Sequence, residues 1–88
     1  MSNSLPPGWT GNSKCHQTEI VGLRLIVTEF PYSTRFWWRS IIGDVVQDGP
    51  ERGHETAAEA RADGIAAVEA FARKLLEETA KLREVPNE

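Results

Sequence analysis

A two-residue interruption between apolar runs, Gly43-Asp44, constrains the fold of this chain more than any other feature. The apolar run before it ends at Ile42, and the next begins at Val45. Glycine adopts the positive φ that the first position of a two-residue hairpin turn requires, so we expect a tight β-hairpin here. The stretch from Arg35 to Glu59 is then a strand, a turn, a second strand, a loop and the start of a helix.

The hairpin fixes which side chains share a face, because neighbouring residues of a strand point to opposite sides. Phe36 and Trp38 fall on the face that we assign to the core. The opposite face includes Arg39, whose expected partner across the hairpin is Asp48. An ion pair favours water, so this second face is the wetter one. It carries Arg35, Trp37, Arg39 and Ile41.

Residues 18–30 supply one more strand, since apolar side chains recur at alternate positions. These positions are Val21, Leu23, Leu25 and Val27. Residues 1–17 are rich in Ser, Asn, Pro and Gly, and we expect a flexible N-terminal arm. Its Trp9 either folds back over the edge of the core or serves as an exposed anchor for a partner. The arm could also cover Trp37.

A long helix follows the hairpin. Thr56-Ala57-Ala58-Glu59 fits a capping box, in which the hydroxyl and the carboxylate each accept a hydrogen bond from an unpaired backbone amide. We expect the helix to run from Thr56 to about Glu84 and to end at Pro86. Its early residues are small enough to lie close to a sheet. Because the helix is longer than the strands, its last turns should overhang the sheet.

The fold class is therefore α+β: an antiparallel three-stranded β-meander packed against one long C-terminal α-helix. Residues 18–85 form this single βββα domain, and residues 86–88 form a tail. On the overhang, Leu75 and Leu82 continue the apolar spacing. The overhang is explained by frayed ends, by a cap that it forms over the N-terminal arm, or by a helix–helix contact in a homodimer through these two leucines.

No catalytic or metal-binding constellation is evident, and we expect a protein that is not an enzyme and needs no cofactor. A zinc site takes about four ligands, whereas Cys15, His16 and His54 offer no such framework. We read both histidines as surface or loop residues. The single cysteine and the absence of an apolar leader or membrane-length segment predict a cytoplasmic protein, in the host cell if a phage encodes it.

Two surfaces remain to carry function. One is the wetter sheet face around Trp37, since Trp and Arg are enriched at binding hot spots. The other is an acidic helix face that includes Glu59, Asp63 and Glu69. The net charge of −3 disfavours binding to a nucleic-acid backbone, which requires Lys and Arg to neutralise phosphates.

One sequence pattern joins the hairpin to the start of the helix. It consists of Trp37-Trp38-Arg39, Gly43-Asp44, Val45-Val46, Gly49 and Thr56-Ala57-Ala58-Glu59-Ala60. This pattern resembles small, mostly uncharacterised bacterial and phage proteins built as a β-meander plus a helix. The resemblance implies this fold and a phage or prophage origin, where compact acidic chains often inhibit host defence systems such as CRISPR complexes by binding them.

The strands, glycine-containing loop and Ala-rich helix also resemble the C-terminal half of a double-stranded RNA-binding domain. That family has a lysine cluster at the start of its last helix, whereas this chain has Glu55, Glu59 and Asp63 there. Our leading hypothesis is thus a small protein-binding module, a phage or mobile-element inhibitor that occludes a binding surface of a defence complex. The alternatives are a nucleic-acid-binding accessory domain and a structural homodimer with no separate ligand.

Overall fold

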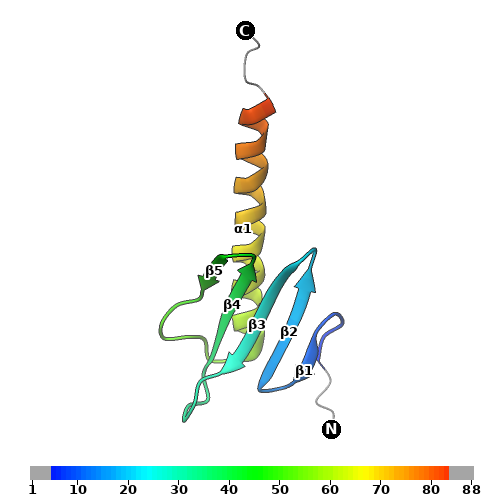
Figure 1. Cartoon of the computed structure of the whole chain (residues 1–88). Helices are drawn as coiled ribbons and strands as arrows, with labels where there is room; N and C mark the ends of the chain where they lie inside the picture. The colour runs from blue at the N-terminus through cyan, green and yellow to red at the C-terminus, as the bar shows by residue number, and fades with distance from the viewer. Residues whose placement is uncertain (1–4, 84–88) are drawn as a thin grey trace.

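The computed structural model describes residues 5–83, which form one antiparallel sheet and one helix that extends far beyond it (Figure 1). The helix, α1, spans Ala57–Arg83. The strands are β1 Thr10–Asn12, β2 Cys15–Ile20, β3 Leu23–Glu29, β4 Phe36–Ile42 and β5 Val45–Asp48. Each strand pairs with the next along the chain, in the order β1-β2-β3-β4-β5. The helix packs on β3 and β4, on one face of the sheet.

The α+β class and the C-terminal helix are confirmed, but within residues 5–83 the sheet has five strands where the sequence predicted three. Residues 18–30 are not one strand, because Val21 and Gly22 form a tight turn between β2 and β3, with φ of 48° and 84°. Ile20 therefore faces Leu23 across a hairpin. A β-branched residue rarely adopts positive φ, so the sequence predicted that Val21 lies within a strand. Its side chain is 97% exposed and is not part of the apolar face.

The other missed strand, β1, pairs with the first half of β2 inside the segment that was expected to be an arm. Asn12 turns the chain between them, since its side-chain oxygen accepts hydrogen bonds from the N–H groups of Lys14 and Cys15, at 2.9 and 3.0 Å. Asparagine commonly makes such a turn with its own side chain. The hairpin was not predicted because the segment is polar and its first strand, β1, is exposed throughout.

The hairpin at Gly43-Asp44 is confirmed, together with its register. Ile42 pairs with Val45, and Arg39 pairs with Asp48. Gly43 has φ of 58°, as the turn requires. The ion pair follows from the register, with Arg39 Nε 2.6 Å from Asp48 Oδ1.

The core lies between the sheet and the first half of α1. Leu25 and Val27 are fully buried, and Trp38 is 4% exposed. The expected close approach of the helix is present at Gly64, where an added Cβ would lie 2.9 Å from Leu25 Cδ1. Phe36 packs at the edge of this cluster, so the assignment of Phe36 and Trp38 to the core is confirmed.

The N-cap has the expected partners with one difference. Thr56 Oγ1 accepts a hydrogen bond from Glu59 N–H at 3.1 Å. The Glu59 carboxylate accepts from the N–H of Glu55 at 3.2 Å, one residue earlier than the motif implies. Every side chain from 72 to 83 is exposed, which confirms the overhang. The described part of the chain is accordingly elongated, with extents of 62 × 26 × 20 Å. The expected helix end near Glu84 and Pro86 and the tail 86–88 lie outside the described residues.

Trp9 folds back onto the core, one of the two alternatives for this side chain. It packs edge-on against His16, with ring centroids 5.3 Å apart. His16 is 1% exposed, so its assignment to the surface was wrong. The strand β2, which was not predicted at this position, turns the imidazole toward the helix.

Both ring nitrogens of His16 have partners. Nδ1 lies 2.9 Å from the carbonyl oxygen of Asn12, and Nε2 lies 3.0 Å from Arg61 Nη1. A guanidinium can only donate, so Nε2 accepts and Nδ1–H donates, which requires a neutral ring. Burial lowers the pKa of His16, the hydrogen bond to Asn12 opposes this, and the positive charge of Arg61 adds to the lowering.

Candidate protein-binding face

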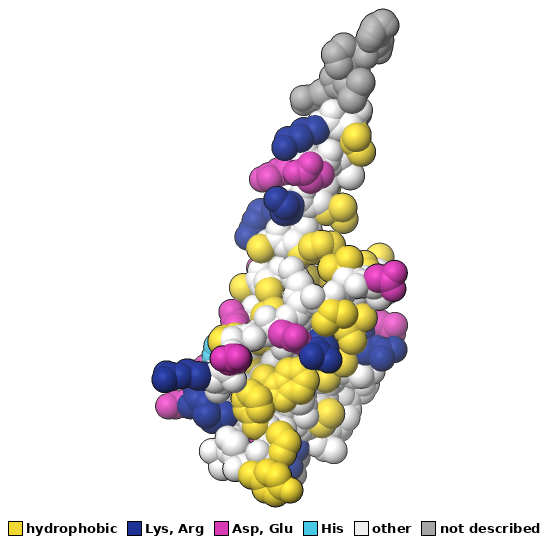
Figure 2. All heavy atoms as spheres, turned by 60° about the vertical axis from the view of Figure 1, so that its left-hand side comes forward, with side chains coloured by type: hydrophobic (Ala, Val, Ile, Leu, Met, Phe, Trp, Pro, Cys, Tyr) yellow, Lys and Arg dark blue, Asp and Glu magenta, His cyan; other side chains and the backbone are white. Residues whose placement is uncertain are grey.

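The side of the sheet opposite α1, called the outer face below, is not covered by any element of residues 5–83. Trp38 and Ser40 point toward the helix, so Trp37, Arg39 and Ile41 point away from it. β1 lies at the far edge of the sheet from β5, and Trp9 packs on the helix side. The described part of the N-terminal segment therefore does not cover Trp37. Figure 2 shows hydrophobic side chains gathered on the molecular surface below the overhanging helix, bordered by basic and acidic groups.

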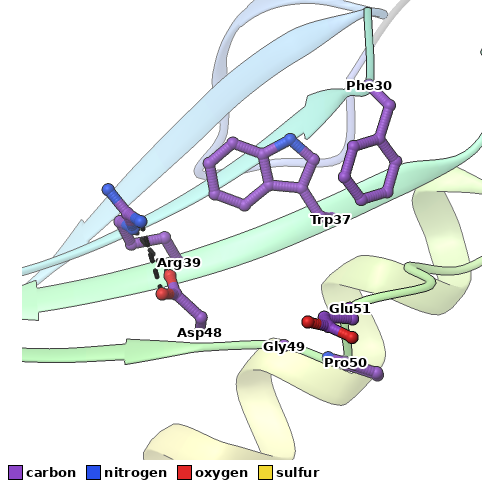
Figure 3. Close-up of a pocket in the computed structure, with 7 residues that line it drawn as sticks. All are labelled: Phe30, Trp37, Arg39, Asp48, Gly49, Pro50 and Glu51. Carbon is purple, nitrogen blue, oxygen red and sulfur yellow. Dashed lines mark hydrogen bonds and ion pairs between the residues drawn. The ribbon is translucent and has the colours of Figure 1, made fainter.

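A groove of about 230 Å³ lies on the outer face where β4 meets the chain after β5. One wall is aromatic: the rings of Phe30 and Trp37 lie 6.2 Å apart and are tilted by 34°. The opposite wall is the segment Gly49-Pro50-Glu51, and the Arg39–Asp48 pair closes one end (Figure 3). The guanidinium of Arg39 lies 5.4 Å from the centroid of the Trp37 ring.

Backbone hydrogen bonds hold the wall of the groove in place. Gly49 N–H donates to the carbonyl of Trp38 at 3.0 Å. A Cβ at Gly49 would lie 2.5 Å from Trp38 Nε1, so glycine is required where this segment crosses the indole. Further along, His54 and Phe36 exchange two backbone hydrogen bonds, at 2.7 and 2.8 Å. The loop is therefore fastened to β4 at both ends.

Arg35 strengthens the same loop. Its Nε donates to the carbonyl of Arg52 at 2.8 Å, and its Nη2 donates to that of Gly53 at 3.1 Å. With Arg52 it lines a second, open hollow of about 430 Å³. The structure therefore places Trp37, Arg39 and Ile41 together on the outer face, while Arg35 lies beside them and organises the loop.

The acidic helix residues do not form one free surface. Asp63 Oδ2 accepts hydrogen bonds from Trp38 Nε1 at 2.9 Å and from His54 Nε2 at 3.0 Å. These two hydrogen bonds lower the pKa of Asp63, and the bond from Trp38 has the larger effect. Glu59 caps the helix, as described above, whereas Glu69 lies on the exposed surface of α1. Asp63 and Glu59 therefore both make hydrogen bonds within the fold.

The two leucines expected at a dimer contact are exposed on the overhang, Leu75 by 53% and Leu82 by 72%. Both belong to the C-terminal half of α1, which extends beyond the sheet (Figure 1). They belong to a separate surface.

Sequence reasoning missed Phe30, Pro50 and Glu51 as groove residues. Thr28 pairs with Trp37, and period-two alternation along β3 carries Phe30 onto the same face as Thr28. That signal could have found the phenylalanine. The approach of Pro50 and Glu51 depends on how the loop folds back, which no local pattern encodes.

Within residues 5–83, no group of three or more His, Cys, Asp or Glu side chains is arranged to hold a metal ion. No helix in this part of the chain has the length and apolarity needed to cross a membrane. Comparisons with protein-family models, with curated proteins and with solved structures give no match, so function must be argued from the geometry of the outer face.

Proposed function

We propose that this chain is a small non-enzymatic protein-binding module that binds its partner through the outer face of the sheet. The observation that carries the proposal is the preformed groove beside Trp37, on a sheet face that no described element covers. A half-buried tryptophan next to an arginine, with a fastened loop as the opposite wall, is the kind of site in which hot-spot contacts form.

The charges of this face favour a protein over a nucleic acid. The Arg39 guanidinium is already compensated by Asp48, and Glu19 lies opposite Arg24 in the register of β2 and β3. A phosphate-binding surface would instead gather uncompensated Lys and Arg. The narrower proposal, that the partner is a host defence complex of the CRISPR type and that binding inhibits it, rests on the sequence resemblance alone.

The test is capture of a partner by the immobilised full chain, followed by measurement of its affinity. We expect Trp37→Ala to weaken binding of the purified partner by at least about tenfold, since truncated hot spots cost roughly 2 kcal/mol or more. Leu76→Ala is the matched control, because this leucine is 69% exposed on the helix overhang. Equal binding by wild type and Trp37→Ala would contradict the proposal. So would Trp37-dependent binding of a single-stranded oligonucleotide that weakens steeply with salt.

A homodimer through α1 is the second candidate, favoured by the exposed Leu75 and Leu82. If it forms, light scattering gives a dimer at high concentration that Leu75→Glu converts to a monomer. Ala80→Glu, an exposed change on the opposite side of the helix, should leave the dimer intact. A wild-type chain that stays monomeric at high concentration eliminates this candidate.

A further inference from the structure

We infer that the groove beside Trp37 receives a cationic side chain, lysine or arginine, of the protein partner. This inference rests on the proposed function and names the chemistry of the group recognised. Two aromatic rings and a proline wall with an acidic residue at its rim form the groove (Figure 3). Aromatic faces attract cations through the negative potential above the ring, and such walls bind ammonium and guanidinium groups.

The chain itself shows that the Trp37 ring accepts a cation. The guanidinium of Arg39 lies 5.4 Å from the ring centroid, within the distance at which this attraction is effective. Asp48 binds the same guanidinium through both of its oxygens, at 2.6 and 3.3 Å. Because that charge is compensated inside the chain, it repels an incoming cation only weakly.

The balance of charge around the groove favours a positive ligand. Its lining carries Arg39, Asp48 and Glu51, one basic and two acidic residues. Asp48 is occupied by Arg39, whereas Glu51 makes no ion pair with any described residue. Figure 3 shows Glu51 on the wall opposite the two rings, so a cation in the groove lies between the aromatic wall and the wall that carries this carboxylate. An uncharged apolar side chain would leave this carboxylate without a partner and gain only the contact with the rings.

The experiment uses the full chain and three acetylated, amidated tripeptides Gly-X-Gly, in which X is arginine, lysine or norleucine. Titrations are followed in ¹H–¹⁵N spectra at the Trp37 indole N–H and the Glu51 amide. We expect saturable shifts with the arginine and lysine peptides, and binding at least about threefold weaker for norleucine, whose side chain lacks the charge.

Glu51→Gln should weaken binding of the arginine peptide by roughly threefold, which is the size of effect expected for an exposed ion pair, and leave the norleucine peptide unchanged. Glu69→Gln, which removes an exposed carboxylate on the helix, is the control and should change neither. Both substitutions are at exposed positions and should leave the fold intact.

Equal binding of the norleucine and arginine peptides overturns the inference, and so does the absence of saturable shifts with all three. Either result leaves the proposed function intact if partner binding still requires Trp37. If partner binding is independent of Trp37, the proposed function fails instead, so the two ideas are distinguished.

Discussion

Asp63 joins three parts of the molecule, and its removal gives the sharpest test of how the fold is held. Its carboxylate lies on α1 and accepts hydrogen bonds from Trp38 on β4 and from His54 in the loop before the helix. Asp63→Ala leaves the indole N–H of Trp38, a residue that is only 4% exposed, without its partner. It also releases His54, whose backbone fastens the loop to β4.

These contacts set the size of the stability loss expected for Asp63→Ala. An unsatisfied buried donor costs about 1–3 kcal/mol, and a hydrogen bond to a charged group contributes about 1.5–3 kcal/mol. The side chain of Asp63 is 41% exposed, so water replaces part of what is lost, which places the effect toward the low end of these ranges. Alanine is the better helix former by at most ~0.7 kcal/mol. We therefore expect Asp63→Ala to lower the free energy of unfolding by about 1.5 kcal/mol.

Urea unfolding at neutral pH, followed by circular dichroism, measures this loss as a lower midpoint at an unchanged slope. A double-mutant cycle with Trp38→Phe, which removes the N–H, should give a coupling energy of about 1 kcal/mol between the two side chains. Glu69→Ala is the control and should change stability by less than about 0.5 kcal/mol. A loss below about 0.5 kcal/mol for Asp63→Ala, or strict additivity with Trp38→Phe, refutes the assigned role.

The carboxylate of Asp63 also makes the free energy of unfolding depend on pH. The pKa of Asp63 is lowered in the folded chain, chiefly by the Trp38 hydrogen bond and then by His54. As the pH falls, the unfolded carboxyl is protonated first, near its ordinary pKa of about 3.9. This contribution is thus complete above about pH 5 and is lost as the pH falls through the lowered folded pKa. The difference in stability between wild type and Asp63→Ala should shrink over that interval, and a constant difference would contradict the argument.

Three further predictions concern single sites. Val21→Asn should raise the free energy of unfolding by up to about 1 kcal/mol in urea, because asparagine tolerates the positive φ and the valine that it replaces is 97% exposed. An unchanged free energy of unfolding would contradict strain at this turn. In the wild type, the free energy of unfolding should fall between about pH 7 and 5, because the imidazole of His16 has a lowered pKa in the fold, where it contacts Arg61, and takes up a proton on unfolding. His16→Gln should make this fall smaller. An unchanged pH profile would count against a neutral, buried ring. Trp38→Ala should cost about 3–5 kcal/mol by thermal or urea unfolding, and Trp37→Ala far less, so equal losses would contradict the assignment of faces.

Local pattern was sufficient for the hairpin between β4 and β5 and for the helix. Gly43 between apolar runs set the pairing of Ile42 with Val45, because a two-residue turn permits only one register. Thr56 and Glu59 marked the start of α1, because the Thr56 hydroxyl accepts from an amide that the helix leaves unpaired and the Glu59 carboxylate accepts from the amide of Glu55, just before the cap. The two faces of β4 followed from alternation.

The first half of the sheet was beyond such reasoning. Val21 occupies a backbone conformation that its side chain disfavours, so the turn before β3 carried only Gly22 as a signal, and the apolar alternation through Val21 concealed it. β1 is held by pairing with β2 rather than by apolar residues of its own, and its burial pattern is uniformly exposed. Both features depend on neighbouring strands.

The sequence by itself determined an α+β chain, a hairpin centred on Gly43, a long overhanging helix and an outward-facing Trp37. Only the tertiary structure decided what those side chains meet. It turned His16 inward against Arg61, placed the Asp63 carboxylate within hydrogen-bond distance of Trp38 and His54, and brought Glu51 into the lining of the groove beside Trp37. The physical reason is that local periodicity specifies the direction of a side chain relative to its own element, whereas its partner is set by packing between elements distant in sequence.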